Sequence, residues 1–198
     1  MRLSRRNARK GDGKNANAPR MTSLQSSDLV LAMQPFARGL AFVLFEGPLS
    51  PIDWAIKEAP GSRRYELILA TTKSLIDRYQ PDVLVVRAHR VYQKAYPRPP
   101  RRFEQAIVSY AAGQAIECKR YTREEIRLCF QDTGANTRYE IAQAIAAHVP
   151  ALSHRLPPVK KLWQSEDRRM ALFDAASLAL THFCNGGPRG SEDNLPTT

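Results

Sequence analysis

The sequence lacks the signatures of several common protein classes. No apolar run approaches the ~20 residues that a membrane-spanning helix needs, and the first twenty residues lack the apolar core of a secretory signal. No Ser-His-Asp or Cys-His arrangement and no glycine-rich phosphate loop is present. The three cysteines have neither metal-ligand nor redox spacing: Cys118, Cys129 and Cys184. We therefore expect a cytoplasmic protein without membrane attachment, in which the thiols are free or buried.

Acidic residues are scarce. Against 30 Lys and Arg there are 19 Asp and Glu, which gives a net charge of +11 and a pI near 10.0. Such an excess favours a polyanionic partner, most often nucleic acid and sometimes an anionic membrane surface, although a basic protein without a specific partner is the alternative. About half of the excess lies in residues 1–20, where Asp12 is the only acid. We predict a flexible, disordered basic arm at 1–25, one domain at 26–185 and a disordered tail at 186–198.

The apolar pattern predicts an α/β domain. Continuous apolar runs at residues 40–45 and 83–86 are typical of buried strands. Thr122 followed by Glu125 forms a capping-box pattern, which predicts the start of a helix. The remaining predicted elements are strands at 52–57 and 116–121 and helices at 65–79, 103–115, 137–148 and 167–183. This order predicts a mixed sheet with a late helix packed across it.

Four blocks within residues 40–183 carry a family resemblance. They read AFVLFEGPLSPIDWAI, LIDRYQPDVLVVRA, TGANTRYEIAQAI and ALFDAASLALTH. In this order and spacing they resemble the RuvC family of DNA junction resolvases. The resemblance implies an α/β, RNase H-like fold with a mixed five-stranded sheet and helices on both faces, and a role in DNA recombination and repair. It also implies a two-fold homodimer, for which the small-residue helix at 103–115 is the expected interface.

The family's chemistry is only partly retained. In the family four carboxylates hold two divalent metals, Mg²⁺ or Mn²⁺, which activate water against a phosphodiester. Matched by position, these carboxylates fall on Glu46, Arg87, Ala171 and Asp174. The resemblance thus leaves Glu46 and Asp174 as metal ligands. A guanidinium cannot bind a cation, so Arg87 would repel the metal or act as a counter-charge to the two carboxylates.

Other acids could complete the site. Asp53 lies on the predicted strand at 52–57, facing either side of the sheet, and Asp167 precedes Asp174 by seven residues on the same helix face. An active enzyme would therefore use Glu46, Asp174 and a displaced carboxylate such as Asp53 or Asp167. The structural alternatives are a turn carboxylate at Glu46 and an acid near a helix N-terminus at Asp174.

A basic stretch follows the strand at 83–86. Its arginines, lysine and histidine could neutralise phosphates, and its tyrosines could stack on exposed bases. The candidates for nucleic-acid binding are Arg87, His89, Arg90, Tyr92, Lys94, Tyr96, Arg98, Arg101 and Arg102. The alternative for the loop at 91–102 is an exposed proline-rich linker. Lys119, Arg120, Arg123 and Arg127 add positive charge nearby in the sequence.

These observations favour a nucleic-acid-binding, RuvC-like protein that recognises branched or structured DNA with a degenerate nuclease site and no cofactor. It would then be associated with the nucleoid. One alternative is a working Mg²⁺-dependent, structure-selective endonuclease that hydrolyses phosphodiesters. A more remote one is a non-catalytic subunit that binds another protein through the former nuclease face.

Overall fold

The computed structural model describes residues 28–36, 38–59, 61, 63–88, 99–160, 163 and 165–186, with only the backbone at 99–104. The strands are β1 Leu29–Phe36, β2 Gly39–Glu46, β3 Pro51–Glu58, β4 Val83–Arg87 and β5 Glu117–Tyr121. The helices are α1 Arg64–Tyr79, α2 Pro99–Gly113, α3 Arg123–Cys129, α4 Arg138–His148, α5 Pro150–Ser153 and α6 Met170–Asn185, with a 3₁₀ turn, η2, at Gln131–Thr133. The arm at 1–25 and nearly all of the tail at 186–198 lie outside the described residues.

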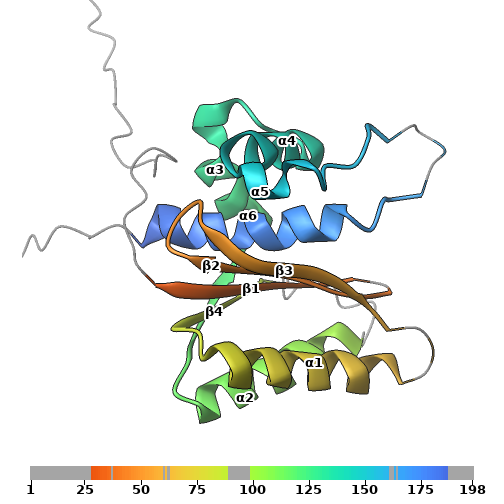
Figure 1. The fold of residues 1–198 in the computed structure, drawn as a ribbon, viewed down its shortest axis with the longest axis vertical. Coiled ribbons are helices and arrows are strands. Elements are labelled where there is room, and N and C mark those ends of the chain that lie inside the picture. Colours follow the sequence, from red (N-terminus) through yellow and green to blue (C-terminus); the bar gives the residue numbers. More distant parts are fainter. Residues whose placement is uncertain are drawn as a thin grey trace, which may run out of the picture.

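The five strands form one mixed sheet in the order β3-β2-β1-β4-β5. The first three strands pair antiparallel, whereas β1, β4 and β5 pair parallel. Figure 1 shows α1 and α2 on one face of the sheet and α6 with α3, α4 and α5 on the other. The predicted α/β architecture, a mixed five-stranded sheet with helices on both faces, is confirmed.

The strand at residues 40–45 is β2, because the chain already contains β1 before it. Eight consecutive residue pairs join the two strands, from Leu29 with Glu46 to Phe36 with Gly39. The glycine is required there, since a Cβ at Gly39 would lie 2.0 Å from the carbonyl oxygen of Lys57 in β3. The first strand of this chain is therefore β1, whereas the sequence matching that placed Glu46 on a first strand used β2.

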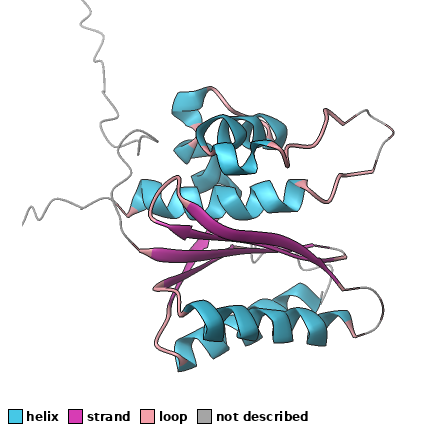
Figure 2. Ribbon diagram, viewed as in Figure 1, coloured by secondary structure: helices cyan, strands magenta, loops and turns pink. Residues whose placement is uncertain are grey.

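Alternation along the strands separates two cores. In β1, Val30 and Ala32 face α6, whereas Leu31 and Met33 face α1 and α2. α6 is buried along almost its whole length, because its apolar and small side chains pack on the sheet on one side and on α3 and α4 on the other. Figure 2 shows this helix lying between the strands and the helices α3, α4 and α5. Within the described residues, no helix has the length and apolarity to span a bilayer.

Several boundaries differ from prediction. α2 begins at Pro99 instead of 103, and α5 lies between 148 and 167, where no element was predicted. Both begin at a proline, which the first helical turn tolerates because its N–H groups have no intrahelical partner. The predicted capping box is confirmed, since Thr122 Oγ1 accepts from the Glu125 amide while the Glu125 carboxylate accepts from the Thr122 amide.

The prediction of free or buried thiols is wrong for two cysteines. Cys129 at the end of α3 and Cys184 near the end of α6 form a disulfide, with a Cα–Cα distance of 6.2 Å. Their separation of 55 residues gives no spacing signal, because only the packing of α3 against α6 brings them together. Cys118 is a free thiol, and burial raises its pKa.

Candidate functional site

A pocket of about 350 Å³ lies where β1 and β4 end and where α3 and α4 begin, against α6. Its lining joins residues that are far apart in the sequence. They are Gln34, Phe36, Arg87, Arg123, Ile126, Arg127, Asn136, Arg138, Ile141, Phe173, Asp174 and Ser177. Four arginines and, among the described residues, a single carboxylate therefore line the pocket.

The parallel β1–β4 pair places the floor of this pocket. Met33 is in register with Val86, so Gln34 and Arg87 follow side by side at the strand ends. By alternation both point to the α6 face, since Ala32 and Val85 belong to the core on that side. Gln34 Nε2 donates to the Pro35 carbonyl at 2.9 Å, whereas its buried Oε1 has no hydrogen-bond partner among the residues that the structure describes. The end of this chain's first strand thus carries an amide beside Arg87.

Asp174 of α6 is paired with Arg138 of α4. Two nearly parallel hydrogen bonds join them, from Nε to Oδ1 at 2.8 Å and from Nη2 to Oδ2 at 2.6 Å. The Nη1 atom of Arg138 also lies 2.5 Å from Glu166. Burial alone would lower the pKa of Arg138, but the hydrogen bonds and charges of Asp174 and Glu166 outweigh it and raise that pKa. One of the two roles expected for Arg87 was that of counter-charge to Asp174, but in the structure Arg138 pairs with Asp174.

Two of the four arginines in the pocket lie at the capped starts of helices. Arg123 and Arg138 each directly follow the threonine that caps their helix, Thr122 or Thr137. Arg127 lies one turn after Arg123 on the same face of α3. Within the described residues, Arg87, Arg123 and Arg127 make no ion pair. Three guanidinium groups are thus available to a ligand.

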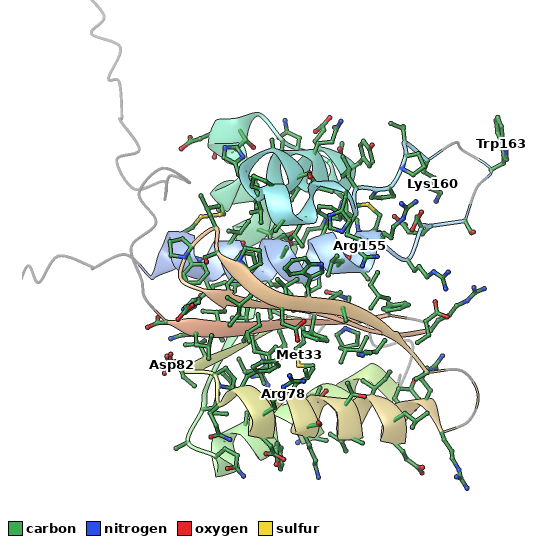
Figure 3. All side chains as sticks on the ribbon, in the orientation of Figure 1. Met33, Arg78, Asp82, Arg155, Lys160 and Trp163 are labelled. Carbon is green, nitrogen blue, oxygen red and sulfur yellow. A yellow bond between two sulfur atoms is a disulfide. The ribbon has the colours of Figure 1, made fainter. Side chains whose placement is uncertain are left out.

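Glu46 does not reach this pocket. It pairs with Leu29 at the start of β1, about 16 Å along the strand from Gln34 at ~3.3 Å per residue. Asp82, which accepts from the Leu29 amide at 2.8 Å, lies at that same end of the sheet (Figure 3). The predicted Glu46–Asp174 metal pair is therefore not assembled, because the strand carrying Glu46 is β2 and not the first strand.

The two predicted substitute carboxylates also lie elsewhere. Asp53 faces α1, where the Tyr79 hydroxyl donates to its Oδ2 at 2.5 Å. Asp167 accepts from the backbone amide of Arg169 at 2.9 Å and from its guanidinium Nη2 at 2.7 Å. These side-chain hydrogen bonds hold the pKa of Asp167 below its ordinary value, against the effect of burial. Asp167 lines a different pocket, beside Pro158 and Val159.

The structure covers only part of the predicted nucleic-acid surface. Arg87 lies in the pocket. Arg101 and Arg102 lie in the first turn of α2, where only the backbone is described. The other candidates lie outside the described residues: His89, Arg90, Tyr92, Lys94, Tyr96 and Arg98. Sequence reasoning missed Gln34, Asn136, Arg138 and Ser177. A signal for Gln34 was present in LVLAMQP, an apolar run directly before it.

The pocket does not fit a pair of divalent metals. Mg²⁺ requires several hard oxygen ligands, chiefly carboxylates. Among the described residues, no three or more His, Cys, Asp or Glu side chains converge on a metal-sized space. Both oxygens of Asp174 already accept from Arg138, and three further arginines line the pocket. Ser177, one turn after Asp174, contributes a hydroxyl that donates to the Asp174 carbonyl at 2.7 Å.

No family model and no curated protein matches the sequence. Among solved structures, Thermus thermophilus RuvC in complex with a Holliday junction substrate gives a TM-score of 0.58 at 16% identity, covering 80% of this chain and 94% of that one. A second structure of Thermus thermophilus RuvC gives a TM-score of 0.56 at 17% identity, covering 80% of this chain and 95% of that one. The yeast mitochondrial Holliday junction resolvase gives 0.56 at 9%, covering 83% and 81%. The chain therefore has a divergent, RuvC-like form of the RNase H-like fold.

Proposed function

We propose that this protein binds branched or otherwise structured DNA without cleaving it. The observation that carries the proposal is the composition of the pocket on the α6 face. Where the resemblance implies converging carboxylates, the chain has Gln34, Arg87 and an Asp174 already paired with Arg138. An arginine-lined pocket attracts phosphate anions and repels the metal ions of hydrolysis.

The charge of the whole chain supports a polyanionic partner. A net charge of +11 creates a positive field that steers nucleic acid toward the protein. Backbone contacts of this kind release counterions, so the affinity should fall steeply as salt is added. The solved RuvC complex contains a Holliday junction, and this makes a four-way junction the first ligand to test.

The alternative is an active endonuclease, which would need Glu46, Asp174 and a third carboxylate in one place. In the structure Glu46 lies at the opposite end of β1, and Asp53 lies on the opposite face of the sheet. A cut would therefore require a rearrangement of β2 or β3, whose pairing spans seven register positions. The geometry favours binding over hydrolysis.

The test is binding and cleavage of a labelled four-way junction by the full chain, beside a duplex of the same composition. Each is measured in EDTA, Mg²⁺ and Mn²⁺ at several salt concentrations. We expect tighter binding to the junction, no cleavage, and no loss of affinity in EDTA. Metal-dependent cleavage would establish the endonuclease alternative instead. Absence of binding to both DNAs would leave the protein-binding alternative. The oligomeric state, measured in the same buffers, would test whether the chain dimerises, as expected through residues 103–115.

A further inference from the structure

The pocket is larger and more varied than a site for an isolated phosphate. Its volume of about 350 Å³ lies in the range of small-molecule sites. The arginines form its charged part, and Phe36, Ile126, Ile141 and Phe173 give it an apolar wall. A ligand that matches both parts has an anionic group joined to an apolar or aromatic ring.

We propose that this pocket takes a single nucleotide unit, with its phosphate on Arg87, Arg123 and Arg127 and its sugar or base against the wall that includes Phe36. This inference rests on the proposed function and adds which part of a nucleic acid enters the site. Every nucleotide combines a phosphate with a flat ring, whereas inorganic phosphate offers only the first.

The charges place the phosphate within the pocket. Arg138 is committed to Asp174 and Glu166, so it has less to offer a ligand than the other three arginines. The Asp174 carboxylate repels a second anion and directs the phosphate toward Arg87 and α3. Hydrogen bonds between guanidinium groups and phosphate are short and strong, and they need no metal ion.

The polar groups suit the remainder of a nucleotide. Gln34 Oε1 is buried and has no hydrogen-bond partner in the described part of the chain, so it can accept from a ligand N–H or O–H group. Asn136 is exposed at the pocket and carries a second amide, whose Nδ2 donates to the Gly134 carbonyl. Phe36 is partly exposed, which allows its ring to contact a base.

The first experiment titrates the full chain with inorganic phosphate, thymidine 5′-monophosphate and single-stranded oligothymidine, in EDTA, by calorimetry. Three single variants accompany the wild type: Arg127→Gln, Phe36→Leu and Arg78→Gln. Arg127 is exposed and makes no ion pair with any described residue, so its replacement should leave the fold intact, which unfolding curves verify. Arg78 is an exposed arginine on α1, across the sheet from the pocket, and is the matched control.

We expect Arg127→Gln to weaken nucleotide binding about tenfold and to lower the salt dependence of strand binding by about one phosphate. Phe36→Leu should weaken nucleotide binding and leave inorganic phosphate binding unchanged, whereas Arg78→Gln should change neither. If only the oligonucleotide binds, and the two pocket variants weaken it, the ligand is a unit within a strand. If the mononucleotide also binds, a free nucleotide is accepted too.

Two results would overturn the inference. One is nucleotide or strand binding that Arg127→Gln and Phe36→Leu leave unchanged, and the other is the absence of both mononucleotide and strand binding. A different result would contradict the proposed function, namely that the wild type does not bind the junction. A protein that binds thymidine 5′-monophosphate through Arg127 but ignores the junction would keep the nucleotide site and lose the DNA-binding proposal.

Discussion

The two ends of α6 differ in what surrounds them. Near its start, Asp174 faces the arginine-lined pocket and is held by hydrogen bonds to Arg138. Near its end, Phe183 packs edge-on against Phe45 with ring centroids 6.2 Å apart, and Cys184 is bonded to Cys129. His182 is buried there, and its Nδ1 lies 3.2 Å from the hydroxyl oxygen of Tyr121.

One helix, α6, thus contributes at one end to the stability of the fold and at the other end to the candidate binding site. The later half of α6 is fixed by apolar burial and a covalent bond, so the helix is a rigid support. The earlier half can then carry polar and charged groups at a constant position, as a binding site on a rigid element requires.

The largest effect on stability is expected at the C-terminal end of α6, where the disulfide lies. Cys184→Ser should lower the free energy of unfolding by about 2–4 kcal/mol, because a disulfide that closes a long loop restricts the unfolded chain. Urea unfolding would measure it, with Cys118→Ser as the control. Junction affinity should stay unchanged. Thiol titration of the unreduced protein should find one free cysteine, and three would show that the disulfide is absent.

The next effect is expected at the pocket end. Arg138→Gln should cost about 2 kcal/mol, because it leaves the Asp174 charge without its partner, although the 35% exposure of Arg138 reduces the cost from that of a fully buried pair. Asp174→Asn should cost less, since Arg138 keeps Glu166. Urea unfolding of both variants and of the double variant gives the coupling between them. If the losses in unfolding free energy of the two single variants add up to that of the double variant, the interaction between Arg138 and Asp174 contributes nothing to stability.

A smaller effect concerns metal binding at the same end. Mg²⁺ at millimolar concentration should not raise the unfolding midpoint of the wild type, because Arg87 and Arg138 oppose a cation there. Combining Gln34→Asp with Arg87→Glu adds two carboxylates beside Asp174, and Mg²⁺ should then stabilise the protein by about 1 kcal/mol at several times its dissociation constant. Thermal unfolding measures both proteins. A midpoint shift in the wild type would contradict the metal-free pocket.

The smallest effect is the pH dependence of stability that His182 causes near the C-terminal end of α6. Burial lowers the pKa of His182, against the hydrogen bond and charge of Asp28. The unfolded chain therefore binds this proton at a higher pH than the folded one, and stability falls as pH drops below the ordinary value near 6.5. The unfolding midpoint between pH 7.5 and 5 should decline less in His182→Gln than in the wild type. Equal slopes would assign the decline to other groups.

Local patterns were enough to predict most of the elements. The strand at 83–86, the box at Thr122 and the final helix depend on residues close in sequence, so the pattern alone identifies them. The apolar run at 29–36 was not predicted as a strand, and it contains Pro35, a residue that is unusual inside a sheet. That omission moved the first-strand position from Gln34 to Glu46.

The site was less predictable than the fold because it depends on packing between distant segments. Asp174 was identified from its own helix, but its partner Arg138 lies 36 residues earlier and meets it only where α4 crosses α6. The disulfide between Cys129 and Cys184 has the same origin. Arg87 was predicted at the site because it ends the strand at 83–86, which the family resemblance matches to a strand that ends in a carboxylate.

α3 has only seven residues, which is shorter than a helix that is stable alone. Arg123 and Arg127 lie one turn apart on the same face, and their mutual repulsion opposes the helix. Its capping box, the burial of Ile126 and the disulfide offset that repulsion. An anion between the two arginines would remove it, so an occupied pocket should slow amide hydrogen exchange in α3 while α1 stays unchanged. The helix would then act as a reporter of its own ligand.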